Sequence, residues 1–350
     1  DQRDDVIECG DPYLSSHLRY MLKEVATVAV SNAPEGACIT IDLGDGTVEN
    51  TIGSKPVEHQ YTQPGDYHIV ASWDDNRFEK TIRVYPLLAL TEAMRQFKDP
   101  RYTDVWVMTH RAHTTNRSVP ENSCAAVRDA VSAGADILEL DTHITADGVV
   151  VVCHNSSINA TTNGTGEIKD LTLEQIKSFN LKDRSGNVTS EKMPTLEEYL
   201  REARGKVYVN MDYSPRTASS AQVFEVVRKL DMLEQVFFYC NSDEKANECF
   251  ALDPRCQVYA WFSNYAVLKE HPGVYFVQAS FNSSGVEPAV ASGAILSVNM
   301  KSVTGTDNAN PYVLDVDEAD QIFKKFPDCR MIQTDTPAEL IQYLKSKGKK

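Results

Sequence analysis

Residues 105–154 read VWVMTHRAHTTNRSVPENSCAAVRDAVSAGADILELDTHITADGVVVVCH, and this stretch decides the fold of most of the chain. A short apolar run at 105–109 precedes an amphipathic stretch at 123–134, and a second apolar run follows at 136–141. This order of strand, helix and strand is the repeating unit of parallel α/β folds. The alternation continues toward the C-terminal end, with further apolar runs at 149–154, 206–212, 235–240, 256–262, 274–280, 295–300 and 330–334.

The number of these runs favours a closed barrel. Nine candidate strands over about 245 residues are one more than a (β/α)8 TIM barrel needs, so we expect one of them to lie outside the barrel. Length and alternation fit this α/β fold best, and a doubly wound parallel sheet is the alternative. In a barrel, functional side chains gather at the carboxyl ends of the strands, so the residues that follow each apolar run are the candidates for a site.

The first part of the chain has a different pattern. Between residues 20 and 86, short alternating runs are separated by turn signals such as Asp45-Gly46 and Pro64-Gly65. We therefore expect residues 1–86 to form a small all-β sandwich with an N-terminal extension. A connecting helix is expected at 87–104, and the barrel domain at 105–350.

Composition excludes several classes of protein. The chain has 350 residues, of which 42% are hydrophobic and 24% charged, which is typical of a soluble protein of about two domains. The net charge is −15, so the overall field repels nucleic acid, and any bound phosphate needs a local cationic site. No apolar run approaches the ~20 residues of a transmembrane helix. We expect neither a nucleic-acid partner nor a transmembrane segment, and the start at Asp1 suggests a processed or trimmed form.

Polar residues stand where each of the first three barrel-type runs ends. His110 and Arg111 follow the first run. Glu139 and Asp141 end the second, and His154 follows the third. The two carboxylates are two residues apart, so they project from the same face of a strand. Charged groups at the ends of buried strands are costly unless they are hydrated, paired or metal-bound, and this pattern is typical of an active site.

These side chains suit the cleavage of a phosphodiester. Two carboxylates on one face offer the hard oxygen ligands that Mg²⁺ or Ca²⁺ prefers, and the CxxC spacing of many zinc sites does not occur. The two histidines supply a proton donor and a proton acceptor near neutral pH, and the planar guanidinium of Arg111 suits a phosphate. Together they predict metal-assisted cleavage of a small-molecule phosphodiester.

The order of motifs in the second domain resembles the glycerophosphodiester phosphodiesterase family, whose barrel is of the PLC-like phosphodiesterase type. The resemblance spans about 105–345. It rests on HRA at 110–112, PEN at 120–122, GAD at 134–136, ELD at 139–141, TADG at 145–148, VVVVCHN at 149–155, TTNGTG at 161–166, PTLEEYL at 194–200 and MIQTDTP at 331–337.

A second resemblance concerns the N-terminal domain. LGDGT at 43–47 and HQYTQPGDYHIVAS at 59–72 resemble the PKD-type Ig-like domain. In that family the domain is usually an extracytoplasmic spacer or adhesion module. The resemblance therefore implies an Ig-like sandwich with a possible cell-surface ligand, and no chemistry of its own.

The family resemblance implies a role for each matching polar residue. His110 and His154 would be the acid/base pair, and Arg111 would contact the phosphate. In-line displacement at phosphorus would follow, with one histidine activating the nucleophile and the other protonating the leaving alkoxide. The nucleophile is either water or a neighbouring substrate hydroxyl, and which histidine plays which part stays open.

The resemblance also implies a set of metal ligands for one divalent cation, Ca²⁺ or Mg²⁺. Glu139 and Asp141 are two of them. Family members usually add a third acidic ligand on the fourth strand, and this chain reads VYVNMDY there, at 207–213. Asp212 is favoured because it is charged, and Asn210 is the alternative. Glu121, in the PEN motif, is expected to support the His110 loop rather than to touch the metal.

Several positions depart from the family pattern, and three others have a role that the sequence leaves open. Ala112 replaces the glycine of HRG, and Asn155 replaces the aspartate that follows the second histidine. Strand alternation places His143 two residues beyond Asp141 on the same face, where it either supports the site or takes a surface or packing role. His113 could face the pocket or pack in the loop, and Lys301 could reach a phosphate.

The leading prediction is a phosphoric diester hydrolase acting on a glycerophosphodiester, such as a deacylated phospholipid head group. One alternative is a lipid phosphodiesterase similar to phosphatidylinositol-specific phospholipase C or sphingomyelinase D. The other is a non-catalytic binding or adhesion protein built on a degenerate barrel, which the departures favour and the retained histidines oppose. By family analogy we expect a periplasmic or cell-surface bacterial protein.

Overall fold

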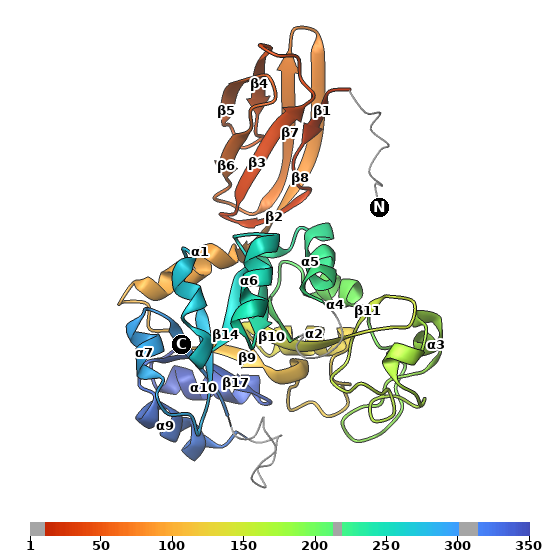
Figure 1. The fold of residues 1–350 in the computed structure, drawn as a ribbon, viewed down its shortest axis with the longest axis vertical. Coiled ribbons are helices and arrows are strands. Elements are labelled where there is room, and N and C mark those ends of the chain that lie inside the picture. The colour runs from red at the N-terminus through yellow and green to blue at the C-terminus, as the bar shows by residue number, and fades with distance from the viewer. Residues whose placement is uncertain (1–10, 213–218, 301–313) are drawn as a thin grey trace. The chain divides into compact units, whose positions relative to one another are not determined.

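A computed structural model describes residues 11–212, 219–300 and 314–350 (Figure 1). The chain forms two compact units, Asp1–Glu92 and Ala93–Lys350. The expected connecting helix at 87–104 is shorter than predicted, since β8 runs to Leu88 and the helical part comprises α1 (Leu90–Arg95) and η1 (Gln96–Lys98). In the described part of the chain, no helix has the length and apolar character needed to cross a membrane.

The N-terminal unit is all-β, as predicted, and consists of two sheets. One sheet has the order β1-β3-β6, and the other has the order β2-β8-β7-β4-β5. Alternate residues of both sheets, such as Val28 and Val30 of β3 and Ile39 and Ile41 of β4, are buried in one common core, so the unit is a sandwich. The strands are β1 (Tyr13–Ser15), β2 (Arg19–Leu22), β3 (Val25–Ser31), β4 (Cys38–Asp42), β5 (Val48–Ile52), β6 (Val57–Gln60), β7 (Gly65–Trp73) and β8 (Asn76–Leu88).

The second unit is the predicted (β/α)8 barrel. Eight parallel strands pair in sequence around the sheet, and the barrel closes where β9 pairs with both β17 and β10. The strands are β9 (Trp106–Thr109), β10 (Ile137–Ile144), β12 (Tyr208–Asp212), β13 (Val236–Cys240), β14 (Gln257–Trp261), β15 (Phe276–Ser280), β16 (Ile295–Asn299) and β17 (Cys329–Thr334). The helices around them include α2 (Cys124–Ser132), α4 (Leu196–Ala203), α5 (Ser220–Lys229), α6 (Asp243–Leu252), α7 (Glu287–Ala291), α9 (Val316–Lys325) and α10 (Pro337–Ser346).

Strand alternation separates a hydrophobic shell from a polar interior. On β10, Leu138 and Leu140 face outward into the core shared with the helices, while Glu139 and Asp141 face the barrel interior. Aromatic rings from four strands fill the interior near the amino ends of the strands, where Trp106 stacks on Tyr208 at 5.1 Å. The bottom of the barrel is therefore packed, and the polar interior residues gather at the carboxyl ends.

The ninth candidate strand is the one that lies outside the barrel. β11 (Val150–Val152) pairs antiparallel with the end of β10 as a hairpin. The expectation that His154 follows a parallel barrel strand is therefore wrong. His154 is close to the barrel mouth because the hairpin turns back, as the hydrogen bond from Cys153 N–H to Asp141 O shows.

The segment after β11 forms an excursion beside the barrel. It contains η3 (Ile168–Asp170) and α3 (Leu173–Ser178), which Figure 1 shows on the same side as β11. The excursion has a small hydrophobic core of its own, which includes Val151, Ile158 and Ile176. This core anchors the loop that carries His154 and Asn155.

Candidate active site

A polar cavity of about 260 Å³ opens at the carboxyl ends of the barrel strands. Every barrel strand or the loop after it contributes to the lining. The lining residues are His110, Arg111, Glu139, Asp141, His154, Asn210, Asp212, Tyr239, Tyr259, Gln278, Asn299 and Gln333. The two predicted histidines, the arginine and all four candidate ligands on β10 and β12 thus share one cavity.

Four of these side chains form a compact patch on two neighbouring strands. In the parallel register of β10 and β12, Glu139 pairs with Asn210 and Asp141 pairs with Asp212. Oxygen atoms of the three carboxylates lie within 4.8 Å of one another. Glu139 and Asp141 are 6% and 2% exposed, so two of the three acids are withdrawn from water.

The electrostatics of this patch favour a bound cation. Burial raises the pKa of Glu139 well above its usual value, and the neighbouring charges of Asp141 and Asp212 raise it further. The Oδ1 atom of Asn210 is buried and has no hydrogen-bond partner among the described residues. Closely spaced carboxylates and an unpartnered amide oxygen are hard ligands, so these residues fit a divalent cation such as Mg²⁺ or Ca²⁺.

Arg111 lies beside this patch and is tied to it twice. Its backbone N–H donates to Glu139 Oε2 at 2.8 Å, and its Nε lies 3.8 Å from Asp141 Oδ2. Glu121 holds the far end of the side chain, with its Oε1 3.3 Å from Arg111 Nη1. The Glu121 carboxylate thus contacts the loop that carries His110 and Arg111.

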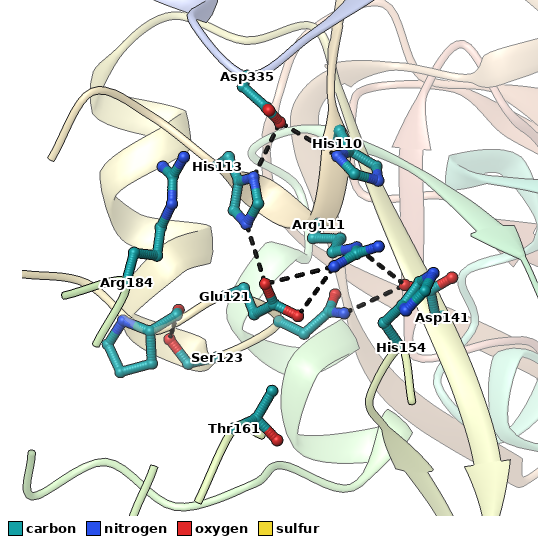
Figure 2. Close-up of polar contacts among 12 residues, drawn as sticks. His110, Arg111, His113, Glu121, Ser123, Asp141, His154, Thr161, Arg184 and Asp335 are labelled. Atoms are coloured by element: carbon teal, nitrogen blue, oxygen red, sulfur yellow. Dashed lines mark hydrogen bonds and ion pairs between the residues drawn. The ribbon is translucent and has the colours of Figure 1, made fainter. Parts of the chain in front are cut away.

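Both histidines have their Nδ1 atoms engaged, as Figure 2 shows for His110. His110 Nδ1 lies 3.1 Å from Asp335 Oδ1, and His154 Nδ1 lies 2.8 Å from Asn155 Oδ1. A carboxylate can only accept a hydrogen bond, so the proton of neutral His110 resides on Nδ1 and its Nε2 is basic. Asn155, which replaces an aspartate of the family pattern, still accepts from Nδ1 but brings no negative charge.

Burial keeps His110 in its neutral form. The loss of hydration lowers its pKa below the usual 6.5, although Asp335 acts in the opposite direction, and the charges of Arg111 and His113 add to the decrease. A neutral imidazole with a basic nitrogen can take up a proton at neutral pH.

Two residues that contact the predicted site or each other escaped the sequence analysis in whole or in part. Asp335 follows the last barrel strand, β17, and orients His110, although it lies 225 residues away in the chain. His113, whose role the sequence leaves open, is buried and bonds the same Asp335 oxygen at 2.8 Å. The signal that could have pointed to Asp335 is its position, because an acid directly after a barrel strand stands at the functional end.

Of the remaining predicted residues, two contact His154, and one lies outside the described part of the chain. His143 is a buried residue of the hairpin itself, paired with Val151 of β11. Its Nε2 lies 3.2 Å from the carbonyl oxygen of His154, so it contacts the loop that carries His154. Asn155 holds the ring of His154. Lys301 lies outside the described residues.

Strain marks the place where alanine replaces the family's glycine. Arg111 and Ala112 have φ angles of 50° and 56°, in the left-handed region that disfavours residues with a Cβ atom. We expect Ala112→Gly to raise the free energy of unfolding by up to about 1 kcal/mol, because relief of this strain outweighs the greater entropy of glycine in the unfolded chain. Urea titration of both proteins measures the change, and a variant less stable than the wild type would contradict the assignment of strain.

The fold and the site together define a class: a (β/α)8 barrel with two histidines beside a candidate cation site at the carboxyl ends of its strands. The sequence model of the glycerophosphoryl diester phosphodiesterase family matches residues 110–293, more than half of the chain. The chain belongs to this family.

Individual relatives cover shorter stretches. The chain is 44% identical over 93 residues to the glycerophosphodiester phosphodiesterase of Caldanaerobacter subterraneus subsp. tengcongensis. The aligned stretch covers 26% of this chain and 37% of that protein. It is 43% identical over 101 residues to glycerophosphodiester phosphodiesterase 1 of Bos taurus. That alignment covers 28% of this chain and 30% of that protein. The chain thus spans about a third of the length of these curated relatives.

A solved structure agrees in fold over a longer range. The crystal structure of a glycerophosphoryl diester phosphodiesterase from Parabacteroides distasonis superposes with a TM-score of 0.63. The match covers 73% of this chain and 92% of that chain at 21% sequence identity. This similarity shows the fold of the barrel.

Proposed function

We propose that the chain is a phosphoric diester hydrolase that cleaves a glycerophosphodiester in the presence of a divalent cation. The observation that carries the proposal is the shared cavity, which brings His110 and His154 together with the three carboxylates of β10 and β12. Each of these groups has a role in phosphodiester cleavage. The family to which the chain belongs is named for the cleavage of glycerophosphoryl diesters. Glu139, Asp141 and Asp212 would hold the cation, with the amide oxygen of Asn210 beside them.

The residues of this chain divide the reaction between them. A cation held by Glu139, Asp141 and Asp212 would supply positive charge that offsets the charge of the phosphate. Arg111 adds a second positive charge from the neighbouring loop and orients the diester. His110 Nε2 takes the proton from the attacking water or substrate hydroxyl as its oxygen bonds to phosphorus. The P–O bond to the departing alcohol breaks, and His154 donates a proton to that oxygen.

The far wall of the cavity suits the glycerol moiety. Gln278, Asn299 and Gln333 come from the consecutive strands β15, β16 and β17, and all three line the cavity. Asn299 Oδ1 is buried and has no hydrogen-bond partner among the described residues. Side-chain amides both donate and accept, so this wall matches the vicinal hydroxyls of a polyol.

The pH dependence follows from the state of His110. A base must be unprotonated to act, and burial lowers the pKa of His110 below 6.5. We therefore expect kcat/KM to stay high at neutral pH and to fall as the pH drops through a pKa below 6.5. Initial rates between pH 5 and 9 at saturating metal measure the profile, and an acid limb centred above pH 7 would contradict the role of His110 as the base.

A substrate panel tests the proposal. Glycerophosphocholine, glycerophosphoethanolamine and glycerophosphoinositol are compared with intact phosphatidylinositol and sphingomyelin in mixed micelles, and products are identified by ³¹P NMR. Turnover of the water-soluble diesters to a phosphomonoester supports the proposal, and a cyclic phosphate would identify a substrate hydroxyl as the nucleophile. Turnover of the intact lipids alone favours a lipid phosphodiesterase, and binding without turnover favours a degenerate barrel.

We also propose that the N-terminal sandwich is a PKD-like module of an extracytoplasmic protein, which could hold the barrel near a cell-surface ligand. The support is the LGDGT turn between β4 and β5 in a two-sheet sandwich. Fractionation of cells that express the full-length protein tests the location, and recovery in the cytosolic fraction would contradict it.

A further inference from the structure

His113 lies between two carboxylates that come from distant parts of the chain. Its Nδ1 is 2.8 Å from Asp335 Oδ1, and its Nε2 is 3.3 Å from Glu121 Oε2 (Figure 2). His113 is only 8% exposed, so few of its hydrogen-bond partners can be water molecules. His113 directly follows η2 (His110–Ala112), Glu121 precedes α2, and Asp335 follows β17. The imidazole therefore joins three loops at the mouth of the barrel.

The chemistry of its partners decides how many protons His113 carries. Burial alone would raise the pKa of Glu121, but hydrogen bonding to His113 and the charge of Arg111 lower it to about 2. Asp335 is likewise held ionised, because its bonds to His110 and His113 lower its pKa despite burial. Ionised carboxylates only accept hydrogen bonds, so both ring nitrogens of His113 must donate. A ring that donates from both nitrogens is an imidazolium.

His113 and His110 meet at a single oxygen. Asp335 Oδ1 accepts from His113 Nδ1 at 2.8 Å and faces His110 Nδ1 at 3.1 Å, and the two rings stand edge to face with centroids 5.5 Å apart. The position of this oxygen sets the tilt of the His110 ring. The charge of His113 also offsets the charge of Asp335, so Asp335 attracts a proton to His110 less strongly than an uncompensated carboxylate would.

We propose that His113 is a positioning residue, held as an imidazolium between Asp335 and Glu121, that orients His110 and keeps it neutral. The inference rests on the proposed function, in which His110 is the base. It deepens that proposal, because it identifies the group that prepares the base for proton uptake.

The charged surroundings of His113 agree with this role. The two acids that contact it are opposed by cations from neighbouring loops, and the bonds to the acids raise the pKa of His113 even though burial lowers it. Arg111 shares Glu121 with His113, and the charge of Arg184 acts against the imidazolium. The titratable and charged groups that face His113 are His110, Arg111, Glu121, Arg184 and Asp335.

A direct test observes the protonation of His113 in the intact protein. With ¹⁵N-labelled histidine, the imidazole resonances of the eight histidines are followed from pH 5.5 to 9, and those of His113 and His110 are assigned from single variants. We expect the His113 ring to lose its second proton at a higher pH than an ordinary histidine and to be doubly protonated at pH 7. A neutral His113 ring at pH 7 would overturn the proposal, and this arm needs no active enzyme.

A pair of variants separates charge from packing. In His113→Gln the compensating charge is lost, so the titration midpoint of His110 is expected to rise by about 1 pH unit. Because His110 acts as the base, the acid limb of kcat/KM should move up with it, and kcat at neutral pH should fall by about 10- to 100-fold with little change in KM. In His113→Lys the cation is kept, and the His110 midpoint is expected to return most of the way to the wild-type value.

Controls keep this test independent of folding and of the proposed reaction. His271→Gln removes a histidine of the same barrel that stacks on Phe250, and it should leave the kinetics unchanged. An unchanged His110 midpoint in a folded His113→Gln variant would refute the role of the charge. If no substrate is turned over but the His110 midpoint shifts as expected, the proposed function fails while the arrangement of His113 stands.

Discussion

His110→Ala is expected to lower kcat/KM for the glycerophosphodiester by about 10⁴-fold or more. The reason is that His110 supplies the basic Nε2 atom, and no second imidazole in the described residues can replace it from the same side. His113 is bound through both ring nitrogens, and the Nδ1 of His154 is held by Asn155. Initial rates at several substrate concentrations measure the change.

The matched control for this prediction is His271→Ala, which truncates a histidine elsewhere on the barrel. It should retain wild-type kinetics. Circular dichroism and thermal unfolding show whether His110→Ala keeps its fold, which we expect because the side chain lies at the cavity rather than in the hydrophobic core. A folded His110→Ala protein with more than a tenth of wild-type kcat/KM would contradict the role of His110 as the base.

Glu139→Gln is expected to weaken divalent-metal binding by at least about 100-fold and to abolish turnover at ordinary metal concentrations. Gln keeps an oxygen that can accept from the backbone N–H of Arg111, so the loop should stay in place. It removes one negative charge from three clustered carboxylates, and with it much of the attraction for a cation. Isothermal titration with Mg²⁺ and Ca²⁺ measures the affinity directly.

Thermal unfolding gives a second readout of the same substitution. For the wild type, metal at 100 times its Kd adds about 2.7 kcal/mol to the free energy of unfolding, so Tm rises with metal concentration. The Tm of Glu139→Gln should rise little with metal concentration. The control Glu287→Gln, which changes an exposed glutamate on α7, should show the full rise of the wild type. In metal-free buffer the variant should be at least as stable as the wild type, because mutual repulsion and burial already raise the pKa of Glu139. An unchanged metal response would rule out Glu139 as a ligand.

Much of the fold can be predicted from short stretches of the sequence. Each strand and helix of the barrel carries its own hydrophobic period, so the alternation at 105–141 predicts the fold before any long-range contact is known. The two carboxylates of β10 share a face for the same local reason. The direction of β11 is not local in this sense, because a short apolar run has the same pattern in a parallel strand and in a hairpin.

The parts of the site that sequence could not predict depend on closure of the barrel. Asp335 meets His113 across 222 residues, because β17 pairs with β9 and completes the ring. No residue near His113 in the sequence indicates that the carboxylate of Asp335 contacts it in the fold, so the sequence leaves the role of His113 open. The sequence alone also could not choose between Asp212 and Asn210 as the third ligand, because alternation places both on one face of β12. The register with β10 brings Asp212 beside Asp141.

Hydrolysis of a glycerophosphodiester with a divalent cation held by Glu139, Asp141 and Asp212 is the function that we propose for this barrel. Its most direct test measures turnover of the best substrate of the panel by one protein sample before EDTA treatment, after it, and after Mg²⁺ or Ca²⁺ is restored. We expect EDTA to abolish turnover and one of the two metals to restore it, while Glu139→Gln stays inactive throughout. Undiminished hydrolysis by the metal-free wild type, with the fold intact, would show that the cation has no part in the reaction.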